Sequence, residues 1–440
     1  MQPIIPYVHS DNEPELQELI ALRRRLHQFP EPGFSEFRTT ALICDDLERL
    51  GYELHVGREL YDDAAREAIQ PDNEVRQHAY EQVCAHMPEN RWLKKMHGGF
   101  TGVVAHLKSG KPGPTFGFRV DIDGLELEES ADEHHRPVSE GFASSNGRTH
   151  ACGHDGHTSI GLGLARRIAD HIDELAGEYW LFFQPAEEST SFKTSGGRIF
   201  ANLACVKELD YFLALHLGIV PERTFVCGLS FLSQKKYFVR FQGSSAHAAK
   251  CPERGRNALL AACCAINNLY AIARHGDGRS RLNIGKFVSD NPSNVIASHT
   301  RFELEARGET DTIREYMVER AHAIIQGAAA MHDVQAECEL KGEWVTAENS
   351  PELMPALRQA AVSCGIPEEA VRDEYFVSGC EDATYLIQAV QQHGGQAAML
   401  CLGSPYGGGH HTATFDFDED LMLWGIRVLW EFTKRTSAAT

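Results

Sequence analysis

The sequence lacks the features that mark membrane-spanning and exported proteins. No apolar run reaches the roughly 18 residues that a spanning helix needs. The first residues, Met1 to Pro6, contain neither a basic segment nor an apolar one of the kind found in a secretory signal. We therefore expect no membrane association and no signal peptide.

Positive charge is also scarce. The 440 residues include 42 Lys and Arg against 62 Asp and Glu, which leaves a formal net charge of −20. A surface of this sign repels phosphate backbones and anionic lipids. Nucleic acids and membrane surfaces are therefore excluded as expected partners, whereas a surplus of carboxylates is compatible with divalent cations.

Closely spaced cysteine pairs are missing as well. The 12 cysteines are scattered from Cys44 to Cys401, and no two of them form a C-x-x-C pair. In a chain of this size such a distribution is not a disulfide framework. Free thiols are typical of a reducing compartment, so a cytoplasmic location is expected.

The order of helical and strand patterns predicts an α/β fold that is interrupted by a smaller unit. Residues 1–229 alternate between strands and helices, which favours a mainly parallel sheet, with a charged helical insertion at 58–97. Residues 230–341 follow the order β-α-β-β-α-β, which is typical of a ferredoxin-like unit. Residues 342–440 return to the first style. We therefore predict one α/β domain built from 1–229 and 342–440, with 230–341 inserted into it.

The densest cluster of metal-binding residue types is His150 to His157, which reads HACGHDGH. It lies where a strand pattern gives way to a helix pattern. In an extended or turning segment, residues i and i+2 point to the same side, so Cys152 and His154 can converge on one ion. A thiolate with imidazoles suits Zn²⁺, and added carboxylates extend the choice to Mn²⁺. The alternative is a polar helix cap with a buried cysteine.

Further candidates follow other strand patterns. Glu187 and Glu188 come after a strand and a proline, and because adjacent side chains diverge, one can bind metal while the other acts as a base. His216 ends an apolar strand, where a buried structural histidine is an equally good interpretation. His410 and His411 follow glycines in a loop that gives no packing reason for two imidazoles.

Two more positions have open interpretations. Asp121 and Asp123 end a buried strand and can either bind metal or accept the N–H of a ligand histidine. His247 lies in the inserted unit, and taken alone it is a surface-loop histidine.

Three segments together resemble the M20 family of metallopeptidases and amidohydrolases, and specifically its amidohydrolase branch. They are the HACGHDGH stretch at 150–157, the FQPAEE stretch at 183–188 and the GHHTATFDFDE stretch at 409–419. The resemblance covers nearly the whole chain. It implies a catalytic domain with two metal ions and an inserted lid or dimerisation domain.

The resemblance also implies roles for individual residues. The implied metal ligands are Cys152, His154, Glu188, His216 and His411, the last chosen over His410 by its spacing to Phe415. Glu187 is the implied general base, and Asp121 is expected to support the ligands. In the inserted unit, His247 is expected to reach a substrate carbonyl across a dimer, while Asn294 and Arg307 hold the substrate.

The implied reaction is metal-dependent hydrolysis of an amide in an N-acyl or N-aroyl amino acid, with a p-aminobenzoyl-glutamate-like substrate favoured. Two divalent ions are expected per chain, Mn²⁺ before Zn²⁺. The expected assembly is a homodimer or a heterodimer with a paralogous chain. One alternative is a dipeptidase or carboxypeptidase of the same family, and another is a non-catalytic, metal-stabilised partner of a second chain. The polar stretch 189–196 departs from the usual family turn, which leaves the substrate open.

Overall fold

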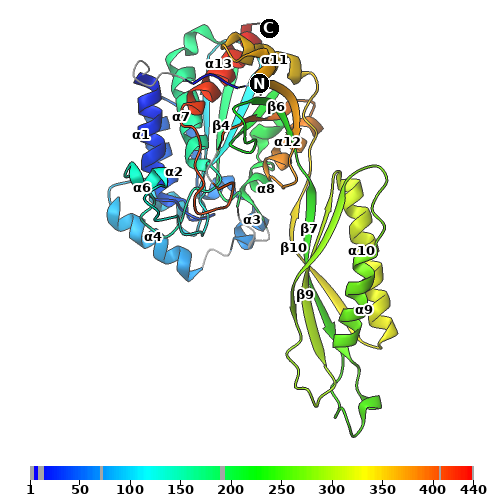
Figure 1. The fold of residues 1–440 in the computed structure, drawn as a ribbon. Coiled ribbons are helices and arrows are strands. Elements are labelled where there is room, and N and C mark those ends of the chain that lie inside the picture. The colour runs from blue at the N-terminus through cyan, green and yellow to red at the C-terminus, as the bar shows by residue number, and fades with distance from the viewer. Residues whose placement is uncertain (1–3, 8–13, 70–72, 189–193, 406–407, 439–440) are drawn as a thin grey trace.

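The computed structural model describes residues 4–7, 14–69, 73–188, 194–405 and 408–438. In them the chain forms one sheet of eight strands and a second sheet of four. Figure 1 shows the smaller sheet standing apart from the main body of the molecule. All twelve cysteines are free. Among the described helices, none is both long and apolar enough to cross a bilayer.

The large sheet has the strand order β1-β2-β4-β3-β5-β12-β6-β11. Its strands are β1 Glu53–Val56, β2 Val103–Lys108, β3 Thr115–Asp121, β4 Glu178–Gln184, β5 Tyr211–Leu217, β6 Phe225–Ser230, β11 Val371–Phe376 and β12 Gln396–Leu402.

This sheet is mixed: four of its seven strand pairs are parallel, and three are antiparallel. Strands β4, β3, β5 and β12 form a parallel block, and β11 is parallel to β6. The β1–β2, β2–β4 and β12–β6 pairs are antiparallel. The last two of these antiparallel pairs arise because two connections between strands are short. Residues 109–114 and 218–224 are too short for the crossover of a dozen or more residues that parallel strands need, so the chain reverses direction there.

Helices bury both faces of the large sheet. Along β5, Leu213 and Leu215 pack into one core cluster with α7 and α13, whereas Phe212 and Ala214 pack into another with α8 and α12. This alternation follows from the two-residue repeat of a strand. The helices of the main body are α1 Pro14–His27, α2 Phe37–Arg49, α3 Asp63–Ala68, α4 Glu74–His86, α5 Leu93–Met96, α6 Arg136–Ser139, α7 His154–Asp170, α8 Gly196–Phe200, α11 Leu353–Ser363, α12 Ala383–Gln392 and α13 Leu421–Ala438.

The four-stranded sheet has the order β10-β7-β9-β8, and all its pairs are antiparallel. Two helices cover one face of it (Figure 1), and their apolar residues form a separate core with the strands. In chain order the elements are β7 Ser233–Gln242, α9 Ala258–Tyr270, β8 Ser280–Val288, β9 His299–Gly308, α10 Asp311–Met331 and β10 Gln335–Trp344. The element order matches the sequence pattern, and β10 runs three residues past position 341.

Candidate metal centre

The predicted metal ligands and the predicted base converge at one edge of the large sheet. Strands β4, β3 and β5 are neighbours and parallel, so their carboxyl ends meet at this edge. Asp121 ends β3, Glu187 and Glu188 follow β4, and His216 is the last residue but one of β5. In open α/β sheets this is the edge where ligands bind.

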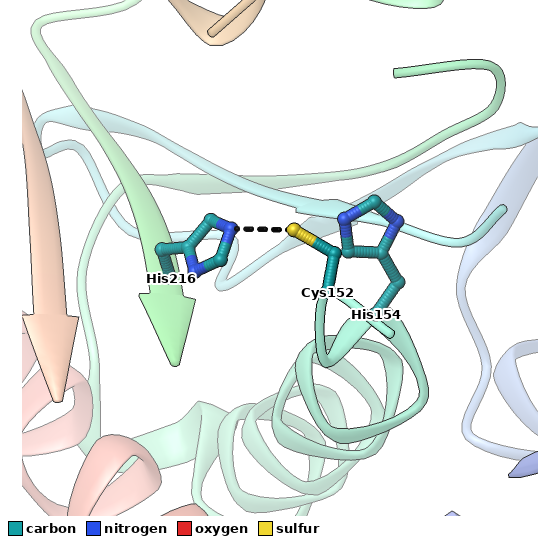
Figure 2. Close-up of side chains that lie close together, drawn as sticks. All are labelled: Cys152, His154 and His216. Atoms are coloured by element: carbon teal, nitrogen blue, oxygen red, sulfur yellow. Dashed lines mark hydrogen bonds between the residues drawn. The ribbon is translucent and has the colours of Figure 1, made fainter. Parts of the chain in front are cut away.

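Cys152 and His154 reach this edge through a turn at the start of α7. Gly153 has a φ of 87°, in the left-handed region that glycine adopts without strain. The helix begins at His154. Figure 2 shows the thiol of Cys152 pointing at the imidazole of His216, with Cys152 Sγ 3.5 Å from His216 Nε2.

Backbone carbonyls orient the two buried histidines. His154 Nδ1 lies 2.9 Å from the carbonyl oxygen of Asp123, and His216 Nδ1 lies 2.7 Å from that of Leu217. Each Nδ1–H therefore donates to a carbonyl and leaves Nε2 facing the cluster, as supporting contacts do for ligand histidines. His154 Nε2 is buried and has no hydrogen-bond partner within the described residues.

His157, the third histidine of the motif, supports the site instead of facing it. Its Nε2 accepts the backbone N–H of Leu217 at 2.8 Å, and its Nδ1 lies 2.5 Å from Asp121 Oδ1. Both ring nitrogens are thus engaged. Asp121 therefore accepts an N–H from His157 and not from the proposed ligand His154. The Nε2 atom of His154 lies 3.7 Å from Asp121 Oδ2.

The two glutamates after β4 share one neighbour, His154, and differ in the others. Oxygens of Glu188 group with Cys152 and His411, whereas Glu187 also groups with Glu381 and Asp382. The backbone N–H groups of Glu187 and Glu188 donate to the two carboxylate oxygens of Asp123, at 3.1 and 3.0 Å.

The structure favours His411 over His410 as the fifth member of the cluster. His411 Nε2 lies 2.9 Å from Glu188 Oε1, and His411 adopts a φ of 57° while its backbone N–H donates to Ala151. His410 instead packs against the rings of His216 and Phe415. Burial lowers the pKa of His410 to about 4.

The charge of this cluster fits bound cations. Burial and the carboxylates of Glu381 and Glu188 raise the pKa of Glu187 well above its ordinary value. Burial and the glutamate pair likewise raise the pKa of the Cys152 thiol. Uncompensated buried negative charge is costly, and divalent cations offset it. Thiol, imidazole and carboxylate donors that lie within 4.8 Å of one another in overlapping groups are a suitable ligand set.

The three predicted substrate residues of the small unit do not lie together. Arg307 is near the body, since it pairs with Gln234 at the start of β7 and donates to the carbonyl oxygen of Ser378 at 3.1 Å. His247 and Asn294 are adjacent to each other, because Ala248 N donates to the Asn294 carbonyl oxygen. They lie beyond the other end of β7, which is about 30 Å away at 3.4 Å per residue.

A buried charge network beneath the glutamates was not assigned from the sequence. Arg119 is fully buried and pairs with Asp121, Glu381 and Asp382 at 2.9–3.0 Å. Arg119 and Asp121 are two residues apart on β3 and so share a face of the sheet. A charged residue at that spacing in an otherwise apolar strand was a signal for this network.

Comparison with known proteins agrees with this geometry. The model of peptidase family M20/M25/M40 matches residues 117–435. The chain is 43% identical over 417 residues to indole-3-acetyl-aspartic acid hydrolase from Enterobacter agglomerans, covering 94% of each chain. It is 41% identical over 410 residues to a p-aminobenzoyl-glutamate hydrolase subunit from Escherichia coli strain K12, covering 92% of this chain and 93% of the relative.

Solved structures show the same fold. The aminobenzoyl-glutamate utilization protein from Klebsiella pneumoniae aligns with a TM-score of 0.74 and 34% identity, over 97% of this chain and 98% of that one. The Bacillus subtilis YXEP protein, described as a dinuclear metal-binding peptidase of the M20 family, aligns with a TM-score of 0.70 and 22% identity, over 97% and 99%.

The chain therefore belongs to peptidase family M20/M25/M40, and the resemblance inferred from its motifs is confirmed. Within this family it is an amidohydrolase, since the relatives that match it along nearly their whole length are amide-cleaving hydrolases by name.

Proposed function

We propose that the chain hydrolyses the amide bond between an aromatic acyl group and an acidic amino acid, with p-aminobenzoyl-glutamate as the first candidate. The observation that carries this proposal is the full-length similarity, above 40% identity, to two relatives named for aromatic conjugates of aspartate and glutamate. A dipeptidase or carboxypeptidase activity is the alternative. The two activities share the same chemistry and differ in the substrate that the residues around the metal centre accept.

The proposed ligands are Cys152, His154, Glu188, His216 and His411, and the proposed base is Glu187. When bound, two divalent ions, Mn²⁺ before Zn²⁺, would lower the pKa of water and polarise the amide carbonyl. Glu187 takes the proton of the attacking water and delivers it to the leaving nitrogen. Asp123 holds the backbone of both glutamates, so that each carboxylate keeps its direction.

The proposed domain roles follow the same division. Residues 1–229 and 342–440 form the catalytic domain, and 230–341 form a lid and dimerisation domain. Arg307 binds a substrate carboxylate, which a negatively charged protein otherwise repels. His247 and Asn294 serve the site of a partner chain, either a second copy or a paralogue. Two relatives whose names describe them as one subunit of a hydrolase, or its homologue, support a partner of this kind.

The test is an activity screen of the purified chain. Metal-free protein is loaded with Mn²⁺ or Zn²⁺ and offered p-aminobenzoyl-glutamate, indole-3-acetyl-aspartate, simple N-acyl amino acids and dipeptides. We expect release of the acidic amino acid, and loss of this activity on chelation. Cleavage of dipeptides alone would move the assignment to a peptidase. Metal uptake without cleavage of any compound would favour a non-catalytic role as the partner of another chain.

A further inference from the structure

The turn that carries the two glutamates has a strained backbone. Ala186 has a φ of 56°, a left-handed conformation that is uncommon for a residue with a Cβ atom. Strain of this kind persists only where the surrounding structure enforces it. Residues 186–188, which we call the catalytic turn, must therefore be held by specific contacts.

Two buried carboxylates supply these contacts. The Ala186 N–H donates to Glu36 Oε1 at 2.8 Å, while the next two N–H groups donate to Asp123. Asp123 belongs to the site already described. Glu36 is the residue just before α2, and it lies 150 residues before Ala186 in the sequence. Glu36 is fully buried, and its other oxygen accepts the hydroxyl of Thr101 at 2.6 Å.

The helical segment 58–97 lies behind Glu36. The Tyr61 hydroxyl donates to the carbonyl oxygen of Thr101 at 2.7 Å, which fixes the residue that bonds to Glu36. Arg76, on α4, is buried and donates to the carbonyl oxygen of Ile69 at 2.6 Å. Burial lowers the pKa of its guanidinium, and the negative charge of Glu36 opposes this shift. A methyl group placed on Gly99 would lie 2.5 Å from the Arg76 side chain, so the packing there is tight.

We propose that Glu36 is a positioning residue for the catalytic turn, and that segment 58–97 supports it through Tyr61 and Arg76. This proposal rests on the proposed function, in which the turn carries a metal ligand and the general base. Without the Glu36 acceptor, the Ala186 N–H is buried and unpaired, and the turn is free to leave its strained conformation. A displacement of about 1 Å at a catalytic group costs about 100-fold in rate.

A purely structural role for Glu36 is the competing explanation, and the chain contains a matched control for it. Glu31 is also buried and also lies before α2. Its carboxylate accepts the backbone N–H groups of Arg38 and Thr39, at 2.9 and 2.8 Å, and so serves the start of the helix. Because Gln has one acceptor oxygen in place of two, Glu31→Gln disturbs one of these two contacts. It reports the effect of a weakened helix contact in the same region, at a side chain that does not contact the catalytic turn.

The experiment compares Glu36→Ala, Glu36→Gln and Glu31→Gln in the full chain at saturating Mn²⁺. Glu36→Ala should lower kcat at least tenfold on p-aminobenzoyl-glutamate, with KM within threefold and metal content retained. Hydrogen–deuterium exchange at amides 186–188 should become faster. Glu36→Gln keeps an acceptor oxygen of the same length and should restore most of the turnover and the protection. Glu31→Gln should change neither.

Several results would overturn the proposal. They are unchanged exchange at 186–188 in Glu36→Ala, faster exchange with unchanged kcat, and an equal loss of kcat in Glu31→Gln. If Glu36→Ala does not fold, Glu36→Asp, which is one methylene shorter, replaces it with the same expected results. The exchange measurement needs no activity. If the wild-type chain cleaves no amide, the proposed function fails, and exchange still decides whether Glu36 holds the turn.

Discussion

At the scale of single residues, the two glutamates of the catalytic turn are distinguished by their neighbours. Glu188 faces the thiol of Cys152 and the imidazole of His411, which are soft and borderline donors. Both glutamates lie within reach of His154, but Glu187 also lies near Glu381 and Asp382, whose negative charge favours a carboxyl group that accepts and releases protons. This difference supports the assignment of one as ligand and the other as base.

The assignment predicts opposite phenotypes for two similar substitutions. Glu187→Gln should keep its metal content near that of the wild type and lower kcat by roughly 10²–10⁴-fold, as is typical of a lost general base. Glu188→Gln should lose metal affinity first. Elemental analysis and steady-state kinetics on both variants are the measurements. If Glu187→Gln lost metal while Glu188→Gln kept it, the two roles would have to be exchanged.

Glu31 makes a prediction about pH and stability. Burial raises the pKa of Glu31 to about 7 from its ordinary 4.5, although two backbone N–H groups oppose the shift. The folded state prefers the neutral carboxyl group of Glu31. The stability that this preference contributes is full below pH 4.5 and is lost as the pH rises through 7. The stability of wild type relative to Glu31→Gln, which stays neutral, should fall by on the order of 3 kcal/mol across this range. Denaturant unfolding of both proteins at pH 5 and pH 8 checks this, and a constant difference would contradict it.

The sequence predicted the residues with recognisable chemistry better than the ones that hold them. Cys152, His154 and the glutamate pair stand in dense, unusual motifs, and the structure brings them together. Glu36 lies in an ordinary-looking segment, and its partner Thr101 is 65 residues away. Arg119 stands out as a charge in an apolar strand, but the strand does not show which residue it pairs with, because Asp382 is 263 residues away. Nothing local marks such contacts, because burial of a charged group is a property of the tertiary structure.

At the scale of elements, helix α10 depends on a side-chain cap. Thr310 Oγ1 accepts the backbone N–H of Ile313 at 3.2 Å, which satisfies one of the free N–H groups at the helix start. Thr310→Ala should therefore destabilise the small unit by about 1 kcal/mol. Thr312, inside the same helix, is the matched control, and Thr312→Ala should have little effect. Exchange protection of α10 in both variants measures the difference, and equal protection would show that the cap contributes nothing.

Strands were predictable where their pattern was long or strongly apolar, and not otherwise. The apolar strands β3, β4, β5 and β12 stand out in the sequence. Strand β6 lies at the predicted domain boundary and β11 is largely polar, so neither was expected. Strand β11 is parallel to β6 at the edge of the sheet, and its outer residues are partly exposed, which gives it no apolar period. The direction of β6 also depends on a short loop, which hydrophobic periodicity does not report.

At the scale of the whole molecule, the residues proposed to bind substrate are spread along the small unit. Strand β7 begins beside the GCED segment at 379–382, where the Cys380 thiol donates to Gln234, and ends about 30 Å away near His247. Within one chain, His247 therefore cannot touch a substrate held at the cluster in this arrangement. If His247 stabilises the oxyanion of an amide substrate, it does so in the site of another chain.

This arrangement predicts that two inactive variants restore each other. His247→Ala should lower turnover without lowering metal content, because His247 is remote from the ligands. When His247→Ala chains and Glu187→Gln chains are mixed and allowed to exchange between dimers, the mixture should regain activity. One site of each hybrid dimer then has both residues intact. Half of a random mixture is hybrid and half of the hybrid sites are good, so about a quarter of wild-type activity is the ceiling for a twofold-symmetric dimer. A mixture of His247→Ala with the double variant His247→Ala/Glu187→Gln is the control and should stay inactive. No recovery after verified exchange would mean that His247 acts within its own chain or has no part in the reaction.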